Sequence, residues 1–179
     1  MNNLQLIKQR FFAMRNGIIA DTLRRSGTPY RMIFGLNLPQ IKEIAADFAP
    51  NLELARQLRD DRATRESQMI APMLMTADYL TVDEATEWLL SAPTVEAIDI
   101  LCHSLLRHHQ AVSEIIDRAL TADSDMAHYG AVRLMWNVFR SNHSHYRSLA
   151  EKELASNRTA TASLTQNLLD EINFLYPTE

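Results

Sequence analysis

Cysteine is almost absent from this chain of 179 residues, because Cys102 is the only one. A single cysteine excludes an intramolecular disulfide and every CxxC-type zinc or redox motif. The sequence therefore carries no mark of an oxidising compartment, and we expect a cytoplasmic protein. We expect the thiol to be buried rather than nucleophilic, since the adjacent His103 would point about 100° away from it on a helix.

Glycine and proline are also rare, with four and six residues respectively, which leaves few places for tight hairpins. Leucine, alanine, methionine, glutamate and arginine fill the stretches between them, with apolar residues at helical spacing. The sequence therefore predicts an all-α protein. A hydrophobic content of 46% is enough for a sizeable core, and no linker-like tract interrupts the chain, so we expect one domain spanning residues 1–179.

Long apolar runs and the common catalytic motifs are missing as well. No segment approaches the roughly 18 consecutive apolar residues of a membrane span, so no membrane partner is expected. Glycine-rich nucleotide loops, GxSxG and HExxH do not occur. The two histidine clusters, His108-His109 and His143-Ser144-His145, lack companion ligands at zinc spacing. We therefore expect neither a metal nor any other cofactor.

Charge is slightly negative overall but unevenly distributed, with a formal net charge of −4. Residues 1–66 carry eleven Lys or Arg against seven Asp or Glu, whereas the remaining residues carry seven against fifteen. The first segment suits a polyanionic partner. The overall sign, however, does not favour strong nonspecific binding to nucleic acid, because phosphate neutralisation supplies most of that affinity.

Helix-start signals recur at intervals of roughly 12 to 20 residues along the chain. A capping residue or a first-turn proline precedes several of the expected helices: Pro39, Asn51, Thr81, Thr94 and Ser124. The expected helices include 40–48, 111–120, 124–139 and 164–176, and we expect nine or ten in all. Consecutive pairs would then recur every ~30 to 35 residues, as in helical repeat arrays. The pattern predicts a HEAT-like α-α superhelix with a functional concave face, and a compact helical bundle is the alternative.

Residues 35–75 contain three distinctive segments in succession. A glycine is followed by Pro39 at a helix start, then by a Leu-x-x-Gln-Leu helix over 54–58, and then by Arg65-Glu66 entering an apolar helix. These segments resemble the opening repeats of the AlkD-like DNA alkylation repair family. The resemblance implies a HEAT-like solenoid that cradles DNA in a positively charged groove. In active members, an aromatic pair and a carboxylate hydrolyse the N-glycosidic bond of N3- or N7-alkylated purines without a cofactor.

The resemblance also implies a location for the chemistry. Residues 96–103 correspond to a Trp-Asp-x-Cys-Asp-like stretch of the family, in which Ile98 stands at the Trp position and Cys102 or His103 at the catalytic Asp position. Asp99 is the candidate catalytic carboxylate, and His103 is a candidate acid or base near neutral pH. The alternatives are a carboxylate stabilised by a helix N-terminus and an exposed imidazole, neither with a function.

A later helix around residues 126–136 resembles the family's aromatic and arginine-bearing helices, with His128 and Tyr129 in place of paired arginines. We take six residues as candidates for nucleic-acid binding: Arg62, Arg65, Tyr129, Arg133, Trp136 and Arg140. For Trp136, packing in the core beside Met135 and Val138 is the alternative.

Two functions remain open from the sequence. The first is an AlkD-like protein that binds alkylated duplex DNA on its concave face, whether or not it also acts as a DNA glycosylase. The second is a catalytically inactive helical scaffold that binds a protein partner. The directions of the arginines separate them, because a shared stripe favours DNA and a scattered arrangement favours the scaffold.

Overall fold

The structure is a computed structural model that describes residues 2–177. Over this range it contains eleven α-helices and no β-strand, only an isolated parallel bridge between Met32 and Thr64. The all-α prediction is confirmed, with slightly more helices than the nine or ten expected. None of the helices in residues 2–177 has the length and apolar character needed to cross a bilayer.

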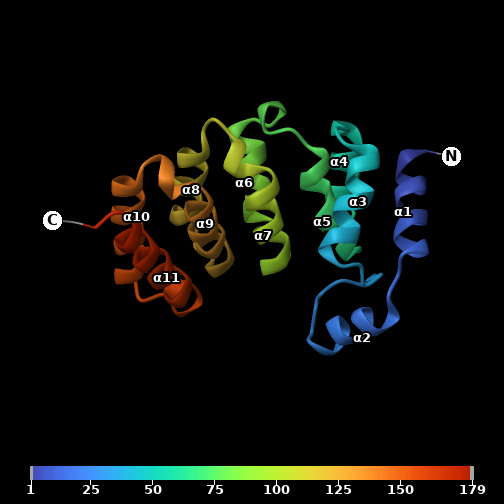
Figure 1. Ribbon diagram of the computed structural model, residues 1–179, viewed down its shortest axis with the longest axis horizontal. Helices are drawn as coiled ribbons and strands as arrows, with labels where there is room; N and C mark the ends of the chain where they lie inside the picture. The colour runs from blue at the N-terminus through green and yellow to red at the C-terminus, as the bar shows by residue number, and fades with distance from the viewer. Residues whose placement is uncertain (1, 178–179) are drawn as a thin grey trace. The chain divides into compact units, whose positions relative to one another are not determined.

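The chain folds into two compact units, the first ending at Tyr79 and the second beginning at Leu80. The expectation of a single domain over 1–179 stays a prediction. The helices of the first unit are α1 (Asn3–Ala13), α2 (Gly17–Arg25), α3 (Leu38–Phe48), α4 (Leu52–Asp60) and α5 (Arg65–Leu74), followed by the 3-10 turn Ala77–Tyr79 (Figure 1).

In the first unit, α5 packs against both α3 and α4, and α1 packs against α4. The core between them is aliphatic, and its fully buried side chains include Ile7, Ile41, Leu58, Ile70 and Leu74. Three of these helices begin at an asparagine that accepts a backbone N–H bond, namely Asn2, Asn37 and Asn51. Pro39 lies in the first turn of α3, as expected, although this helix begins at Leu38.

A buried carboxylate holds the loop between α2 and α3 in place. Glu66, at the start of α5, accepts backbone hydrogen bonds from Phe34, Gly35 and Leu36 at 3.1, 2.9 and 3.3 Å. Gly35 has φ +79°, and a Cβ there would lie 2.2 Å from the carbonyl oxygen of Asn16. The glycine is therefore required both by its backbone conformation and by the close approach of α2.

The second unit is a stack of helix pairs joined by short connections. Its helices are α6 (Val82–Leu90), α7 (Val95–Ser104), α8 (Val112–Thr121), α9 (Asp125–Val138), α10 (His143–Ala155) and α11 (Thr159–Leu175), with 3-10 turns at Leu106–His108 and Phe139–Ser141 (Figure 1). Helix α6 packs against α7, α8 against α9, and α10 against α11.

Neighbouring pairs of the second unit stack in register, because α6 also contacts α8, while α9 contacts both α7 and α11. The second helices of the three pairs thus lie side by side in one layer. This is the packing of an α-α superhelical repeat fold, in which each pair buries its apolar face against the next pair. The more specific assignment to HEAT-like repeats and the concave face stay predictions.

Candidate functional site

Asp99 lies on the half-exposed face of α7. This helix begins where the Thr94 hydroxyl accepts a hydrogen bond from the Ala97 amide at 3.2 Å. Ile98 and Cys102, which flank Asp99 on this helix, are fully buried. Burial raises the pKa of the Cys102 thiol, so it stays protonated and unreactive, as expected from the sequence. The carboxylate of Asp99 is therefore placed at the surface of the layer formed by α7, α9 and α11.

Two side chains of α9 reach Asp99 from across this layer. Arg133 donates from Nε to Asp99 Oδ1 at 2.7 Å and from Nη2 to Oδ2 at 3.2 Å. The Tyr129 hydroxyl donates to Asp99 Oδ1 at 2.9 Å and accepts from Arg133 Nη2 at 3.1 Å. The three side chains form a closed triangle in which both carboxylate oxygens are occupied. Their contacts fix the orientation of Asp99, with its side chain still 36% exposed.

The electrostatics of the triangle are consistent with this arrangement of donors. Burial raises the pKa of the Tyr129 hydroxyl, and the neighbouring Asp99 raises it further. Burial alone would lower the pKa of Arg133, but its hydrogen bonds to Tyr129 and Asp99 outweigh that effect and raise the pKa. Tyr129 is therefore a neutral donor and Arg133 a permanent cation beside the carboxylate.

A second polar group lies about one helical turn further along the same faces. His103 follows Asp99 by four positions on α7, and its Nδ1 lies 3.2 Å from Oδ1 of Asn137 on α9. Asn137 in turn donates to the backbone oxygen of Arg133 at 2.8 Å. Arg107 Nη1 lies 3.5 Å from the same His103 nitrogen. The structure thus brings His103 next to the triangle, although no contact joins it to Asp99.

The remaining two candidates of the second unit are Trp136, on α9, and Arg140, in the turn after it. Trp136 follows Arg133 by three positions and is half-buried. Its burial therefore does not decide between a nucleic-acid contact and packing in the core. Arg140 is exposed just beyond the helix, 3.6 Å from Glu171 of α11 and over the ring of Phe139. Tyr129, Arg133 and Trp136 therefore follow one face of α9 at helical spacing, and Arg140 lies in the 3-10 turn that comes next.

A family model described as DNA alkylation repair enzyme matches residues 7–128, which is more than half of the chain. The chain belongs to this family. Searches of curated proteins and of solved structures found no match. The family match includes Asp99 and His103 and ends just before Tyr129. Membership supports a role in DNA alkylation repair, and it agrees with the resemblance carried by residues 35–75.

In this DNA alkylation repair family member, the two candidate arginines of the first unit have different surroundings. Arg62 is exposed in the loop between α4 and α5. Arg65 is buried, and its Nη1 donates both to the backbone oxygen of Leu36 and to Glu66 Oε1, each at 3.0 Å. The guanidinium of Arg65 is thus part of the contact that fixes the α2–α3 loop, whereas Arg62 faces solvent.

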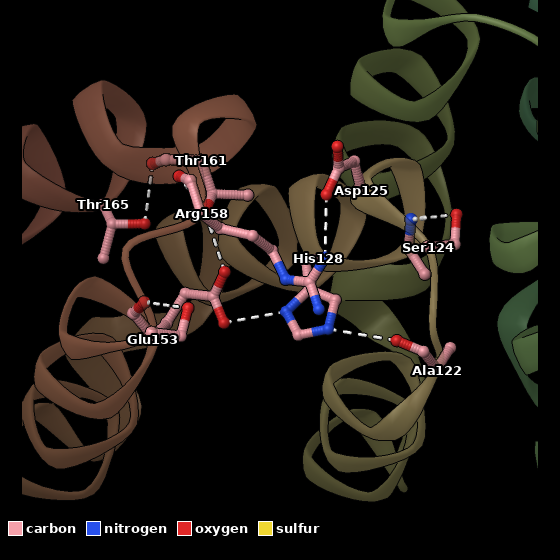
Figure 2. A network of polar contacts seen from close by, with 10 residues as sticks. Ala122, Ser124, Asp125, His128, Glu153, Arg158, Thr161 and Thr165 are labelled. Carbon is pink, nitrogen blue, oxygen red and sulfur yellow. Dashed lines mark hydrogen bonds and ion pairs between the residues drawn. The ribbon is translucent and has the colours of Figure 1, made fainter.

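His128, which stands where the family resemblance places an arginine, is buried in a separate network (Figure 2). Its Nδ1 lies 2.8 Å from Glu153 Oε2 on α10, and its Nε2 lies 3.1 Å from the carbonyl oxygen of Ala122. The other oxygen of Glu153 accepts from the Thr161 hydroxyl of α11 at 2.7 Å. His128, Glu153 and Thr161, which are all buried, thus join the last two helix pairs.

Sequence reasoning did not identify Asn137 and Arg107 as members of the site. The only available signal was spacing, because each follows a candidate residue by four positions, Arg133 and His103 respectively. Among residues 2–177 no cluster of three potential metal-ligating side chains occurs. The candidate site is therefore a half-exposed carboxylate held by a tyrosine and an arginine, with an imidazole and a tryptophan at its margins.

Proposed function

We propose that this protein binds alkylated duplex DNA and releases the damaged purine by hydrolysing its N-glycosidic bond, with Asp99 as the catalytic carboxylate. Membership of the DNA alkylation repair enzyme family supports this reading. The observation that carries it is the orientation of Asp99, whose two oxygens are held by Tyr129 and Arg133 while the side chain remains 36% exposed.

The proposed chemistry asks little of the protein beyond electrostatics. An N3- or N7-alkylated purine is cationic, so the bond from the sugar carbon C1′ to the base breaks with its electron pair moving to the base, which leaves neutral. The sugar becomes oxocarbenium-like, water adds to C1′, and the proton of that water passes to solvent. A carboxylate fixed beside the sugar stabilises the developing positive charge and orients the water.

Tyr129 and Arg133 act through Asp99 in this proposal. Their three hydrogen bonds hold the carboxylate in one orientation before the substrate arrives, so no reorganisation is needed during the reaction. Direct contacts with DNA are assigned to the half-buried Trp136 and the exposed Arg140. Trp136 offers an aromatic face for an unstacked base, and Arg140 offers a guanidinium for the phosphate backbone.

His103 is proposed to contact the nucleic acid beside the reacting sugar, together with Arg107. Both side chains lie beside the triangle, with Arg107 Nη1 3.5 Å from His103 Nδ1. Arg65 is not included among the DNA contacts, because it is buried and bound to Glu66.

The test is base release. Purified protein is incubated with duplex DNA carrying N7-methylguanine or N3-methyladenine, and free base is measured against an enzyme-free control and against undamaged duplex. We expect release from the alkylated duplex alone. Duplex binding without any release would remove the glycosylase proposal and leave a DNA-binding member of the family.

A catalytically inactive helical scaffold is the second candidate, and one observation favours it. Ile98, at the position that corresponds to the family's first tryptophan, is an aliphatic side chain that is fully buried in the core. The aromatic group that the resemblance implies on this helix is therefore replaced. Absence of both base release and duplex binding in the same experiment would favour the scaffold.

A further inference from the structure

Two surface loops of the first unit are joined side by side. The Met32 amide donates to the backbone oxygen of Ala63 at 2.8 Å, and the Arg65 amide donates to the backbone oxygen of Met32 at 3.0 Å. These two bonds form the parallel bridge between the α2–α3 loop and the α4–α5 loop. Arg31 comes one residue before Met32, and Arg62 comes two residues before Thr64. Because the bridge is parallel, both arginines lie at its N-terminal end.

Both loops are held rigidly by buried polar side chains of α5. Glu66 binds three successive amides of the α2–α3 loop. Gln68 donates from Nε2 to the backbone oxygens of Leu58, Arg59 and Asp61, at 3.3, 2.8 and 3.0 Å, and so fixes the end of α4 and the loop that follows. The backbone that carries Arg31 and Arg62 is therefore preorganised, which lowers the entropy cost of binding a ligand.

Four exposed arginines lie on these two loops or at the end of α2, which leads into the first of them: Arg24, Arg25, Arg31 and Arg62. We call them the basic loop patch. Arg24 and Arg25 end α2, and Arg24 Nη2 donates to the backbone oxygen of Ile33, which places it on the α2–α3 loop.

Acidic side chains near the basic loop patch leave most of its charge uncompensated. Asp21 pairs with Arg24 at 2.9 Å, and Asp61 pairs with Lys8 at 2.9 Å. Arg25, Arg31 and Arg62 form no ion pair with an acidic side chain of residues 2–177. Four of the seven Lys and Arg residues of the second unit, by contrast, pair with carboxylates: Arg118, Arg133, Arg140 and Arg158.

We propose that the basic loop patch binds the phosphate backbone of duplex DNA and is a contact separate from the Asp99 site. Guanidinium groups match phosphate geometry with two parallel N–H bonds, and several unpaired ones on a fixed backbone suit a polyanion of regular charge spacing. The choice of DNA as the polyanion rests on the proposed function. The patch adds affinity for any duplex and contributes nothing to the bond-breaking step.

The experiment measures the affinity of the protein for an undamaged oligonucleotide duplex as a function of salt concentration. The double variant Arg31→Gln and Arg62→Gln is compared with Lys42→Gln and Lys152→Gln, which removes the same charge from two exposed lysines elsewhere. Losing two phosphate contacts should lower the slope of log affinity against log salt by about 1.8 and weaken binding by between about ten- and a hundredfold at 0.1 M salt. The lysine variant should retain the slope of the unmodified protein.

Several results overturn the proposal. One is equal slopes for the arginine variant and the unmodified protein, and another is the same loss in both double variants, which would indicate net charge alone. Arg62 Nη1 donates to Gln68 Oε1 at 3.5 Å, so Arg62→Gln also removes a contact within the fold. The second variant is therefore Arg25→Gln with Arg31→Gln, and its unfolding temperature verifies the fold. Loss of binding to phosphatidylserine vesicles without any effect on DNA would assign the patch to a lipid surface instead.

The outcome is separable from that of the proposed function. Base release by the unmodified protein, together with weakened binding and a lower salt slope in the arginine variant, supports both proposals. Base release by the unmodified protein, together with normal DNA binding by the arginine variant, would contradict only the proposal for the basic loop patch. Salt-sensitive DNA binding through the patch, without any base release, would contradict only the proposed glycosylase activity.

Discussion

Arg133 and Asp99 lie 34 positions apart in the sequence and meet across two helices, with Arg133 Nε 2.7 Å from Asp99 Oδ1. Arg133, a candidate for nucleic-acid binding, holds this carboxylate together with Tyr129. The candidate catalytic residue is thus held by groups from the neighbouring helix pair. The geometry of the site therefore depends on how α7 packs against α9.

Removing Arg133 should release Asp99 and lower stability only modestly. The pair is 29% and 36% exposed, so water screens much of its Coulomb energy, and Arg133→Gln should cost about 0.5 to 1 kcal/mol. Asp99→Asn in the same background should add less than it does alone, because both changes remove one interaction. Urea unfolding of the two single variants and the double variant measures this coupling, and strict additivity would mean that the contact carries no energy.

Tyr129 should make the protein lose stability at alkaline pH. Burial raises its pKa above the ordinary value of 10.0, so the folded state holds the proton more tightly than the unfolded state. The sign follows from linkage: this stabilisation is complete below about pH 10 and is lost as pH rises through the higher folded pKa. We expect Tyr129→Phe to flatten the decline in urea midpoint between about pH 9 and 11. Tyr79→Phe, at an exposed tyrosine, should leave the decline unchanged.

Gly35→Ala should destabilise the first unit strongly. The new Cβ would lie 2.2 Å from the Asn16 oxygen and 2.8 Å from the Ala20 nitrogen, at a residue with φ +79°. Backbone cannot move aside as a flexible side chain can, so we expect a loss of about 2 kcal/mol or more. Gly17→Ala is the control, because nothing lies within 4 Å of its Cβ position. Similar unfolding midpoints for the two variants would contradict the packing of α2 described above.

Glu66→Gln should also be costly. The buried carboxylate accepts three backbone amides and the guanidinium of Arg65, and an amide group cannot balance that positive charge. Breaking a buried pair on one side leaves the other charge uncompensated, at a cost of about 3 kcal/mol. Glu43→Gln, at an exposed residue 3.8 Å from Arg10, should change stability by less than about 0.5 kcal/mol. Chemical denaturation of both variants compares them directly.

Much of the fold could be predicted from the sequence because its signals are local. Asn51, Thr81, Thr94 and Ser124 cap helices as expected, since capping needs only a side-chain oxygen beside a free amide two or three residues on. The last helix was predicted to begin at 164 but begins at Thr159. Residues 159–163 are Thr, Ala and Ser, which carry no apolar periodicity, and packing against α10 overrides their weak propensity.

The candidate site was only partly predictable. The resemblance pointed to Asp99, Tyr129 and Arg133 singly, but no local pattern indicates that they touch, because their contact depends on the pairing of α7 with α9. Burial of Arg65 was missed for a similar reason. Its partners, Leu36 and Glu66, become close only when the α2–α3 loop folds onto α5.

Single-turnover release of N7-methylguanine tests the central claim most directly, with protein in excess over an alkylated duplex and Asp99→Asn compared with Asp117→Asn. Asp117 is an exposed acid on α8, so the control removes the same charge from the same unit. We expect Asp99→Asn to slow release by about a hundredfold or more while duplex binding is retained, and Asp117→Asn to match the unmodified protein. Equal release rates for Asp99→Asn and the unmodified protein would contradict the assignment of Asp99 as the catalytic carboxylate.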